Sequence, residues 1–272
     1  MSERLVIVGW DGSAVADEAV HWAARCSERF GRRLRVVMVV RSGPDPRTDA
    51  FARARALIAE VAPEVAVETE VINGHPVEAL RDQSAEGALV AVGTRGHSQF
   101  ASTLLGSVSD GLSQHARGPI VIVRGSTEHE PSAPVVVGVD GSDTSARAID
   151  FAAEYAEGAG APLLGVAAWP YPWRAQDPKD LETAVLDGQA HAERLLSAAL
   201  AEVRAAHPDL VVDSLLTDTD PAQALIEAAR EAQLVVVGSR GRGGFAGMLL
   251  GSVSRTVLRH APCPVAVVRP RR

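Results

Sequence analysis

The sequence predicts an α/β protein built from two tandem, doubly wound domains with parallel sheets. Three observations lead to this fold class. Three motifs occur twice in the same order along the 272 residues. Apolar runs rich in β-branched residues alternate with segments of helical spacing. A polar, proline-rich stretch separates the two copies. Continuous apolar strands with helices between them are typical of parallel sheets that are covered on both faces.

The repeat consists of three pairs of matching segments. They are Val6–Ser13 with Val136–Ser142, Val92–Gly96 with Val237–Gly241, and Leu104–Ser109 with Leu249–Ser254. The first pair is offset by 129 residues and the other two pairs by 145. Chance cannot explain three collinear matches, so we infer a duplication. The 16 additional residues of the second copy are expected around Pro170 to Pro178 and in the helix that follows.

The boundary between the copies lies in a segment without periodicity. Residues 125–134 are polar and rich in proline, as is usual for an interdomain linker. We therefore expect a first domain at residues 1–125, a linker at residues 126–134 and a second domain at residues 135–272.

Each copy predicts five strands with helices between them. In the first copy the apolar runs predict strands at Arg4–Val8, Leu34–Val40, Val65–Ile72, Ala88–Val92 and Ile120–Val123. Helical spacing predicts helices at Ala14–Phe30, Arg47–Val61, Pro76–Glu86 and Ser107–His115. The second copy predicts strands near Val135, Leu163, Leu210, Leu234 and Pro264. Sheets of this kind bind ligands at the carboxyl ends of their strands, near the point where the strand order reverses.

Composition excludes several classes of protein. The net charge of −7 argues against a nucleic-acid-binding protein, which needs a basic face. No apolar run reaches membrane-spanning length, and Met1–Arg4 leads directly into a strand rather than into a signal peptide. We therefore expect no nucleic acid and no membrane as partners. We also expect a cytoplasmic location, with Cys26 and Cys263 as buried thiols.

The most specific motif is a glycine spacing at the end of the fourth strand. The pattern Gly-x2-Gly-x9-Gly-Ser occurs at residues 93–107 and again at residues 238–252. Glycines allow a ligand to approach the backbone closely, and N–H groups at a helix N-terminus attract anions. Four hydroxyls near the end of the motif can donate to phosphate oxygens, namely Ser107, Ser109, Ser252 and Ser254. The alternative is a glycine-rich turn with serine as a plain N-cap, and the recurrence of the whole motif weakens it.

Two familiar phosphate-binding motifs do not fit this loop. Lys179 is the only lysine of the chain, so no loop can supply the lysine of a P-loop. The dinucleotide fingerprint follows the first strand of its domain and has a different glycine spacing.

An aspartate follows the first strand of each copy, at Asp11 and Asp140. Its carboxylate can accept a hydrogen bond from a ribose hydroxyl, or hold a divalent ion on bound phosphates. The alternative is an N-cap, but Ser13 and Ser142 are better placed to cap the next helix. No Ser-His-Asp or Cys-His arrangement repeats, so these two aspartates, with a bound metal, are the only candidates for catalysis.

Other side chains near the loops allow two interpretations. Arg95 and Arg240 can grip phosphates as a fork, or they can simply be solvated. His97 can line the same site, but its counterpart is Arg242, which rules out a catalytic histidine common to both copies. In the second copy, an aromatic group can either wall an adenine site or form a loop cluster, and it comprises Trp169, Tyr171 and Trp173.

Taken together, these residues resemble the universal stress protein family in its bacterial tandem form. Three features carry the resemblance: Val-Gly-x-Asp-Gly-Ser at the first strand, the run from Gly238 to Ser254, and His-Ala-Pro-Cys-Pro-Val-Ala-Val-Val at residues 260–268. The first copy matches more loosely, with His97–Phe100 in the loop and Gly118-Pro119 in place of Cys-Pro.

The resemblance implies an adenine nucleotide alpha hydrolase-like fold with strand order 3-2-1-4-5 and ATP at the strand ends. It also implies dimerisation through the last strand, with the strands near Ile120 and Val265 pairing first within the chain. The glycine motif would hold phosphates and ribose, and backbone near Val39 and Ala168 would hold adenine. The loop after the third strand differs between the copies, at residues 74–76 and 219–221, so the two sites are expected to differ in affinity.

The ATP-binding residues implied in the first copy are Gly9, Asp11, Val39, Gly93, Thr94, Arg95, Gly96, His97, Ser98, Gln99, Gly106, Ser107, Val108 and Ser109. Those implied in the second copy are Gly138, Asp140, Ala168, Gly238, Ser239, Arg240, Gly241, Arg242, Gly243, Gly244, Gly251, Ser252, Val253 and Ser254.

We therefore expect a nucleotide-dependent stress-response or regulatory protein that binds ATP at two sites per chain and forms a homodimer. The protein alone predicts no metal centre, although Mg²⁺ can accompany ATP near Asp11 and Asp140. No residue is assigned a catalytic role. Two alternatives are a slow Mg-dependent ATPase or autokinase, and a dimeric scaffold without nucleotide.

Overall fold

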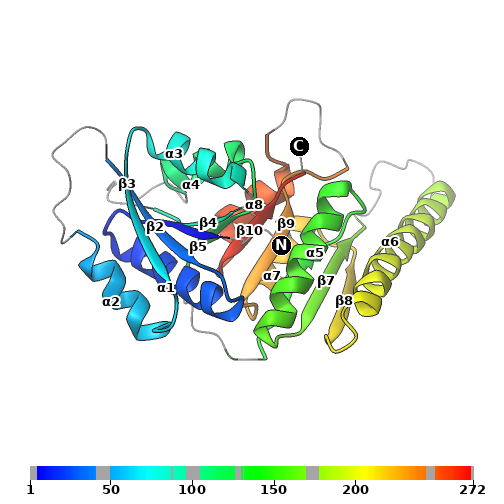
Figure 1. Ribbon diagram of the computed structural model, residues 1–272. Coiled ribbons are helices and arrows are strands. Elements are labelled where there is room, and N and C mark those ends of the chain that lie inside the picture. The colour runs from blue at the N-terminus through cyan, green and yellow to red at the C-terminus, as the bar shows by residue number, and fades with distance from the viewer. Residues whose placement is uncertain are drawn as a thin grey trace. The chain divides into compact units, whose positions relative to one another are not determined.

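A computed structural model describes residues 5–40, 50–86, 88–95, 105–125, 130, 132–169, 178–242 and 249–270. Within these ranges, strands and helices alternate along the chain (Figure 1). The chain divides into two compact units. The first unit contains the first copy together with Cys263–Val267, and the second unit contains most of the second copy.

The first unit is a parallel sheet in the order β3-β2-β1-β4-β5. Its strands are β1 (Val6–Gly9), β2 (Leu34–Val40), β3 (Val67–Asn73), β4 (Leu89–Gly93) and β5 (Ile120–Val123). Its helices are α1 (Ala14–Arg29), α2 (Ala52–Val61), α3 (Pro76–Gln83), the 3-10 turn η1 (Ser84–Glu86) and α4 (Ser107–His115). The pair α1 and α2 covers one face of the sheet, and the pair α3 and α4 covers the other (Figure 1).

The second unit repeats this arrangement, with four parallel strands in the order β9-β6-β7-β8. The strands are β6 (Val135–Gly138), β7 (Leu163–Ala168), β8 (Val212–Thr217) and β9 (Leu234–Gly238). The helices are α5 (Asp143–Ala159), α6 (Pro178–Ala206), α7 (Pro221–Ala228) and α8 (Ser252–His260). Helices α5 and α6 pack together on one face, and α7 and α8 pack together on the other (Figure 1). The predicted fold class is thus confirmed.

The ends of a few elements differ from the predicted ones. Strand β3 begins at Val67 rather than Val65, because the N–H of Val65 closes a turn onto the carbonyl of Ala62 at 3.2 Å. Helix α3 ends at Gln83, since Ser84 begins a tighter 3-10 turn. The predicted start of the second helix, at residue 47, lies outside the described residues.

The apolar runs of the sequence form the interior of each sheet. The side chains of Val6–Val8 and Ile120–Val123 are completely buried, and so are Val135–Val137 and Leu234–Val236. A strand covered on both faces by helices needs apolar residues at every position. This explains why these runs are continuous rather than alternating.

A sixth strand, β10 (Val265–Val268), joins the first unit at its β5 edge. It pairs antiparallel with β5, placing Val265 opposite Ile122 and Val267 opposite Ile120. The expected pairing of the strands near Ile120 and Val265 within one chain is therefore present.

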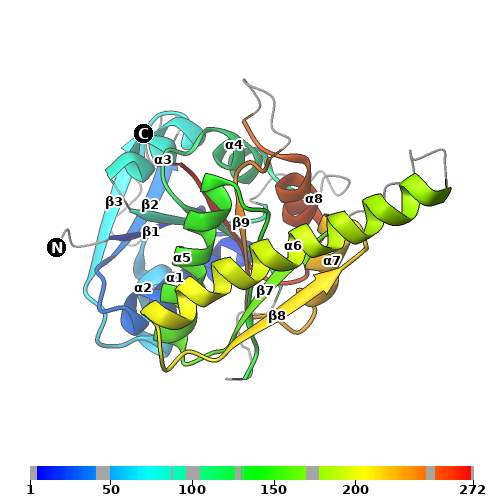
Figure 2. The same cartoon turned by 90° about the vertical axis from the view of Figure 1, so that its right-hand side faces the viewer.

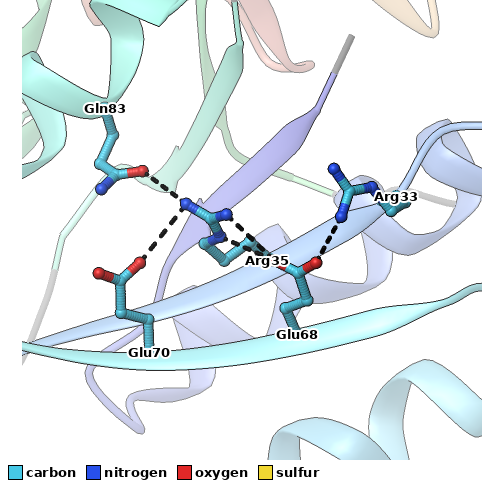
Figure 3. Close-up of polar contacts among 5 residues, drawn as sticks. All are labelled: Arg33, Arg35, Glu68, Glu70 and Gln83. Atoms are coloured by element: carbon cyan, nitrogen blue, oxygen red, sulfur yellow. Dashed lines mark hydrogen bonds and ion pairs between the residues drawn. The ribbon is translucent and has the colours of Figure 1, made fainter. Parts of the chain in front are cut away.

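At the other edge of the first unit, β3 is fastened to β2 by a network of charged side chains (Figure 3). Arg35 of β2 donates to Glu68 of β3 at 3.0 and 3.1 Å and lies 3.5 Å from the carboxylate of Glu70. It also donates to Gln83 of α3 at 3.2 Å, and Arg33 pairs with Glu68 at 2.6 Å. The network fixes the register in which Arg35 lies directly opposite Glu68.

The additional residues of the second copy lie where they were expected. Twenty-six residues separate β2 from β3, whereas 43 separate β7 from β8. Helix α6 has 29 residues, compared with 10 in α2. It runs alongside β7 and β8, and its amino-terminal end projects beyond the other elements of the second unit (Figure 2). None of the described helices is both long enough and apolar enough to cross a membrane.

Candidate functional site

The candidate site of the first unit lies where β1 and β4 end side by side. These neighbouring strands are parallel, with Gly9 opposite Val92, so the turn after β1 and the loop after β4 leave the sheet at the same edge. The strand order reverses between β1 and β4, which is where sheets of this type bind ligands. In the second unit β6 and β9 have the same relation.

Each aspartate that follows the first strand is held in place by the serine two residues on. Asp11 Oδ1 accepts from the backbone N–H of Ser13 at 3.0 Å and from its hydroxyl at 2.6 Å. Asp140 Oδ1 accepts from Ser142 in the same way, at 2.9 and 2.6 Å. The glycine between each pair has a positive φ of 82° or 76°, which glycine adopts without steric cost.

The same serines cap the following helices. Ser13 Oγ accepts from Ala16 N at 3.3 Å, and Ser142 Oγ accepts from Ser145 N at 3.2 Å. The capping role that the sequence assigned to these serines is therefore confirmed. The carboxylates of Asp11 and Asp140 are not the caps of these helices. The capping serines hold them at the edge of the sheet where the fourth strand of each unit also ends.

The glycines at the strand ends serve close packing. A Cβ on Gly93 would lie 2.7 Å from the carbonyl oxygen of Val15 in α1, and one on Gly238 would lie 2.9 Å from Thr144 Oγ1 in α5. A Cβ on Gly9 would lie 2.8 Å from Leu80 of α3. These positions are glycine because the flanking helices approach the sheet too closely for any side chain.

The ends of each glycine loop are tied together at its base. In the first unit Gly106 N donates to Thr94 O at 2.7 Å, and the buried Ser109 hydroxyl donates to the same carbonyl at 2.8 Å. In the second unit Gly251 N donates to Ser239 O at 2.8 Å. Ser254 Oγ donates to Gly238 O at 2.6 Å.

These bonds divide the serines into two kinds. A hydroxyl carries one proton, and those of Ser109 and Ser254 are directed to backbone carbonyls. Ser107 and Ser252, by contrast, are exposed at the first positions of α4 and α8. Of the four hydroxyls, those of Ser107 and Ser252 are therefore the candidates for donation to a phosphate.

Helices α4 and α8 begin without a side-chain cap. Their N-cap residues are Gly106 and Gly251, so neither helix has an N-cap side chain that accepts a hydrogen bond from its first turn. A helix N-terminus has backbone donors without intrahelical partners and a positive partial charge. Each unit thus presents an anion-attracting helix end beside a fixed carboxylate.

Positive charge also gathers at the ends of β4 and β5 in the first unit. Burial lowers the pKa of the Arg124 guanidinium, the charge of Cys263 raises it, and the positive charge of Arg95 lowers it further. Arg95 itself is exposed, as the interpretation of a solvated arginine allows. Arg124 could not be predicted as part of this group, because only the pairing of β4 with β5 brings it near Arg95.

The first unit has a buried aromatic residue next to its aspartate. Trp10 donates its indole N–H to Asp17 Oδ1 at 2.9 Å, and Arg53 pairs with the other oxygen of Asp17. The ring of Trp10 lies 6.1 Å from that of Phe51. Val139 occupies the matching position in the second unit, so the surroundings of the two aspartates differ.

The second unit contains a side-chain contact near its candidate site that the sequence did not predict. Arg242 Nη1 lies 2.8 Å from Nε2 of His191, a residue of α6. His191 is far from the motif in sequence and lies in the segment that the first copy lacks. No repeat or motif could have indicated it.

Several expected site residues can be placed only in part. Val39 and Ala168 are half-buried near the ends of β2 and β7, Val108 and Val253 lie in the first turns of α4 and α8, and Arg240 is half-buried. Trp169 follows β7 and faces Gly188 of α6. Gly138 ends β6, and Gly241 lies against the Asp140 carboxylate. Six further expected residues lie outside the described residues, namely Gly96, His97, Ser98, Gln99, Gly243 and Gly244, as do Tyr171 and Trp173.

No three His, Cys, Asp or Glu side chains come together as a metal site within the described ranges. A divalent ion beside Asp11 or Asp140 would therefore need ligands from phosphate oxygens and water, as Mg²⁺ commonly has.

Both copies of the repeat match the same family of known proteins. The model of the universal stress protein family matches residues 3–124 and again residues 132–269. A universal stress protein of Mycobacterium tuberculosis is 36% identical over 97% of this chain and 94% of its own length. One of Mycolicibacterium smegmatis is 35% identical over 99% of this chain and 98% of its own length.

The fold has a solved counterpart. The crystal structure of a universal stress protein from Archaeoglobus fulgidus matches all of this chain and all of its own, with a TM-score of 0.68 and 23% identity. The similarity thus extends through both copies in sequence and in fold. The chain belongs to the universal stress protein family, with two copies of the family domain in tandem.

Proposed function

We propose that this protein binds ATP at two sites per chain and acts as a nucleotide-dependent regulatory protein of the stress response. One observation carries the proposal: each unit places an uncapped helix N-terminus, a loop tied at its base and a fixed aspartate at the same edge of its sheet. The helix ends suit phosphates, and the carboxylates suit ribose hydroxyls or a phosphate-bound Mg²⁺.

The phosphates and the adenine of each nucleotide lie at the ends of different strands. Phosphates lie against the loops after β4 and β9, where Ser107 and Ser252 donate to them. Adenine lies at the ends of β2 and β7, against the backbone near Val39 and Ala168. Both strand ends border the first strand of their own unit, so one nucleotide can span base and phosphate positions.

The direct test is to identify any nucleotide that the purified protein releases when it is denatured. The purified protein is denatured and the supernatant is analysed by chromatography and mass spectrometry, and nucleotide-free protein is then titrated with ATP by calorimetry. We expect adenine nucleotide in the supernatant and close to two ATP bound per chain. Protein that releases no nucleotide and gives no heat with added ATP would refute the proposal.

A slow Mg-dependent ATPase or autokinase is the second candidate, and the fixed positions of Asp11 and Asp140 favour it. It requires phosphate release, or incorporation of the γ-phosphate into the chain, that depends on Mg²⁺ and disappears in the Asp11→Ala/Asp140→Ala variant. The same variant distinguishes turnover from binding alone. A dimeric scaffold without nucleotide is the outcome if the titration shows no binding.

We further propose that the protein works in the cytoplasm as a homodimer. Cys26 and Cys263 are buried thiols that form no disulfide, as is usual in a reducing compartment. Sedimentation velocity, with and without ATP, tests the dimer, and a chain that sediments as a monomer in both conditions contradicts it.

A further inference from the structure

The insertion of the second copy brings a helix to its candidate site. Helix α6 packs on α5, β7 and β8, and the side chain of Leu195 lies 2.9 Å from the position of a Cβ on Gly141. Gly141 directly follows Asp140, so α6 reaches the turn that holds the aspartate. Helix α2 of the first unit is shorter and instead supplies Arg53 to Asp17.

A side chain from this helix holds an arginine of the glycine loop. The guanidinium of Arg242 is always protonated, so it donates to Nε2 of His191 at 2.8 Å, and the imidazole accepts. Another nitrogen, Nη2, lies 2.7 Å from the position of a Cβ on Gly141. The Arg242 guanidinium therefore packs against the backbone of Gly141, in the turn that follows Asp140, and His191 of α6 orients it.

In the described part of the chain Arg242 has no carboxylate partner: Asp140 accepts from Ser142 through Oδ1, and the other oxygen of Asp140 abuts Gly241. The first turn of α8 contains Arg255 and no acid, whereas the matching turn of α4 contains Asp110. The first turn of α8 is thus more positive than that of α4.

A buried hydroxyl at the base of the same loop also lacks a partner. Ser239 is 1% exposed, and its Oγ makes no hydrogen bond with any described residue. An unpaired buried hydroxyl costs free energy that a bound acceptor can recover. Arg242, the uncapped end of α8 and Ser239 thus all belong to the loop after β9.

We propose that Arg242, positioned by His191 of α6, contacts the terminal phosphate at the second site and makes this site selective for nucleoside triphosphate over monophosphate. The inference rests on the proposed function, since it assumes that nucleotide binds there. Arginine suits this role because its planar fork can donate two hydrogen bonds to one phosphate. His191 is a positioning residue: it acts only through Arg242.

The test uses the full chain with its first site disabled by Gly106→Asp. The N-cap backbone there, with φ −75° and ψ 165°, is one that aspartate adopts, and its carboxylate caps α4 and repels phosphate. A Cβ at this position would lie 3.2 Å from Arg95 Cα and Thr94 O, so the substitution also displaces the base of the loop slightly, which helps to disable the site. Affinities for ATP, ADP and AMP are then measured by calorimetry. We expect the Gly106→Asp parent to bind ATP at least tenfold more tightly than AMP.

Four further substitutions in this parent separate the roles. Arg242→Ala should weaken ATP about tenfold or more and leave AMP within twofold, because hydrogen bonds to a charged phosphate are lost. His191→Ala should lower the ATP preference in the same direction. His191→Gln should restore it, since the amide oxygen can accept from Arg242. Arg194→Ala, which removes an exposed arginine one turn along α6, should change nothing.

Unchanged AMP affinity shows that each variant is folded, so a change in the ATP-to-AMP ratio cannot come from misfolding. If the parent binds all three nucleotides and Arg242→Ala leaves the ratio unchanged, or weakens ATP and AMP equally, this inference is wrong while the proposed function stands. If the parent and the unmodified chain bind no nucleotide, both fail.

Discussion

Glycines of the repeated loop differ in what they do. Gly93 and Gly238 make room for α1 and α5, whereas a Cβ on Gly241 would collide with the Asp140 carboxylate. Gly251 is different again: a Cβ there would meet its nearest atoms at 3.6 Å, an ordinary contact. Its backbone, with φ −69° and ψ 160°, is open to any residue. This position therefore allows a side chain to be tested without strain.

At Gly251 we expect aspartate and alanine to have opposite effects on binding. Gly251→Asp should cap α8 with its own carboxylate and abolish nucleotide binding at the second site, because the anion loses its donors and meets a like charge. Gly251→Ala should keep the binding. Calorimetry should give one ATP per chain for the aspartate variant and two for the alanine variant.

The free energy of unfolding should stay within about 1 kcal/mol of the original in Gly251→Asp, since aspartate is a better N-cap than glycine, and should fall by about 1 kcal/mol in Gly251→Ala, since alanine is a poor N-cap. A Gly251→Asp chain that still binds two ATP would contradict the placement of phosphate at α8.

Cys26 is a buried thiol of α1. Burial raises the pKa of its thiol from the ordinary 9.0 to about 12, although the positive charges of Arg32 and Arg29 act to lower it. The folded state therefore holds this proton more tightly than the unfolded state. The contribution to stability is complete below pH 9 and is lost as the pH rises toward 12.

The free energy of unfolding of the first unit should thus fall more steeply above pH 9 in the original chain than in Cys26→Ala. The slope for one group approaches about 1.4 kcal/mol per pH unit. Urea titrations at pH 8 and pH 10.5 measure it, and parallel losses in the two proteins would show that Cys26 does not titrate on unfolding.

Among the elements, β3 depends on side chains more than the other strands of its sheet. It is an edge strand whose residues are half-buried or exposed. Arg35 links it to β2 and α3 through three partners, and its side chain is 24% exposed (Figure 3). Arg55 of α2 reaches the same strand through one hydrogen bond to Thr69, at 2.9 Å.

We expect Arg35→Ala to destabilise the first unit by about 1–2 kcal/mol, because it leaves Glu68 and Glu70 close together without a shared cation. Arg55→Ala should stay within about 0.5 kcal/mol, as is usual for exposed residues. Chemical denaturation of the two variants makes the comparison. Equal losses would mean that the network does not fasten β3.

At the scale of the whole molecule, the division into two structural units differs from the division into two sequence copies. Cys263–Val267 belongs to the second copy in sequence but to the first unit in contacts. Strand β5 is completely buried, and β10 covers its outer edge. An uncovered edge of such a strand is a template for pairing with another chain.

A fragment of residues 1–125 should therefore self-associate through β5. Sedimentation velocity should show dimers or larger species that an excess of a synthetic peptide of residues 262–269 reduces to monomers. The full chain, in which β10 occupies that edge, provides the control. A fragment that remains monomeric without the peptide would contradict this expectation.

The sequence alone determined the duplication, the strand order implied by its resemblance, and the location of the inserted segment. These features follow from local patterns: continuous apolar runs specify buried strands, and glycine with serine marks turns and helix starts. The capping roles of Ser13 and Ser142 were predictable for the same reason, because a cap lies within three residues of the donors it satisfies.

Only the tertiary structure decided which groups far apart in the chain meet. It placed Arg124 near Arg95, directed the hydroxyls of Ser109 and Ser254 to carbonyls, and joined His191 to Arg242. Contacts of this kind depend on strand pairing and helix packing, which the periodicity of one segment does not contain. A serine or an arginine forms hydrogen bonds with whichever suitable group lies nearest. Which groups lie near one another in space is decided by the fold, not by the motif.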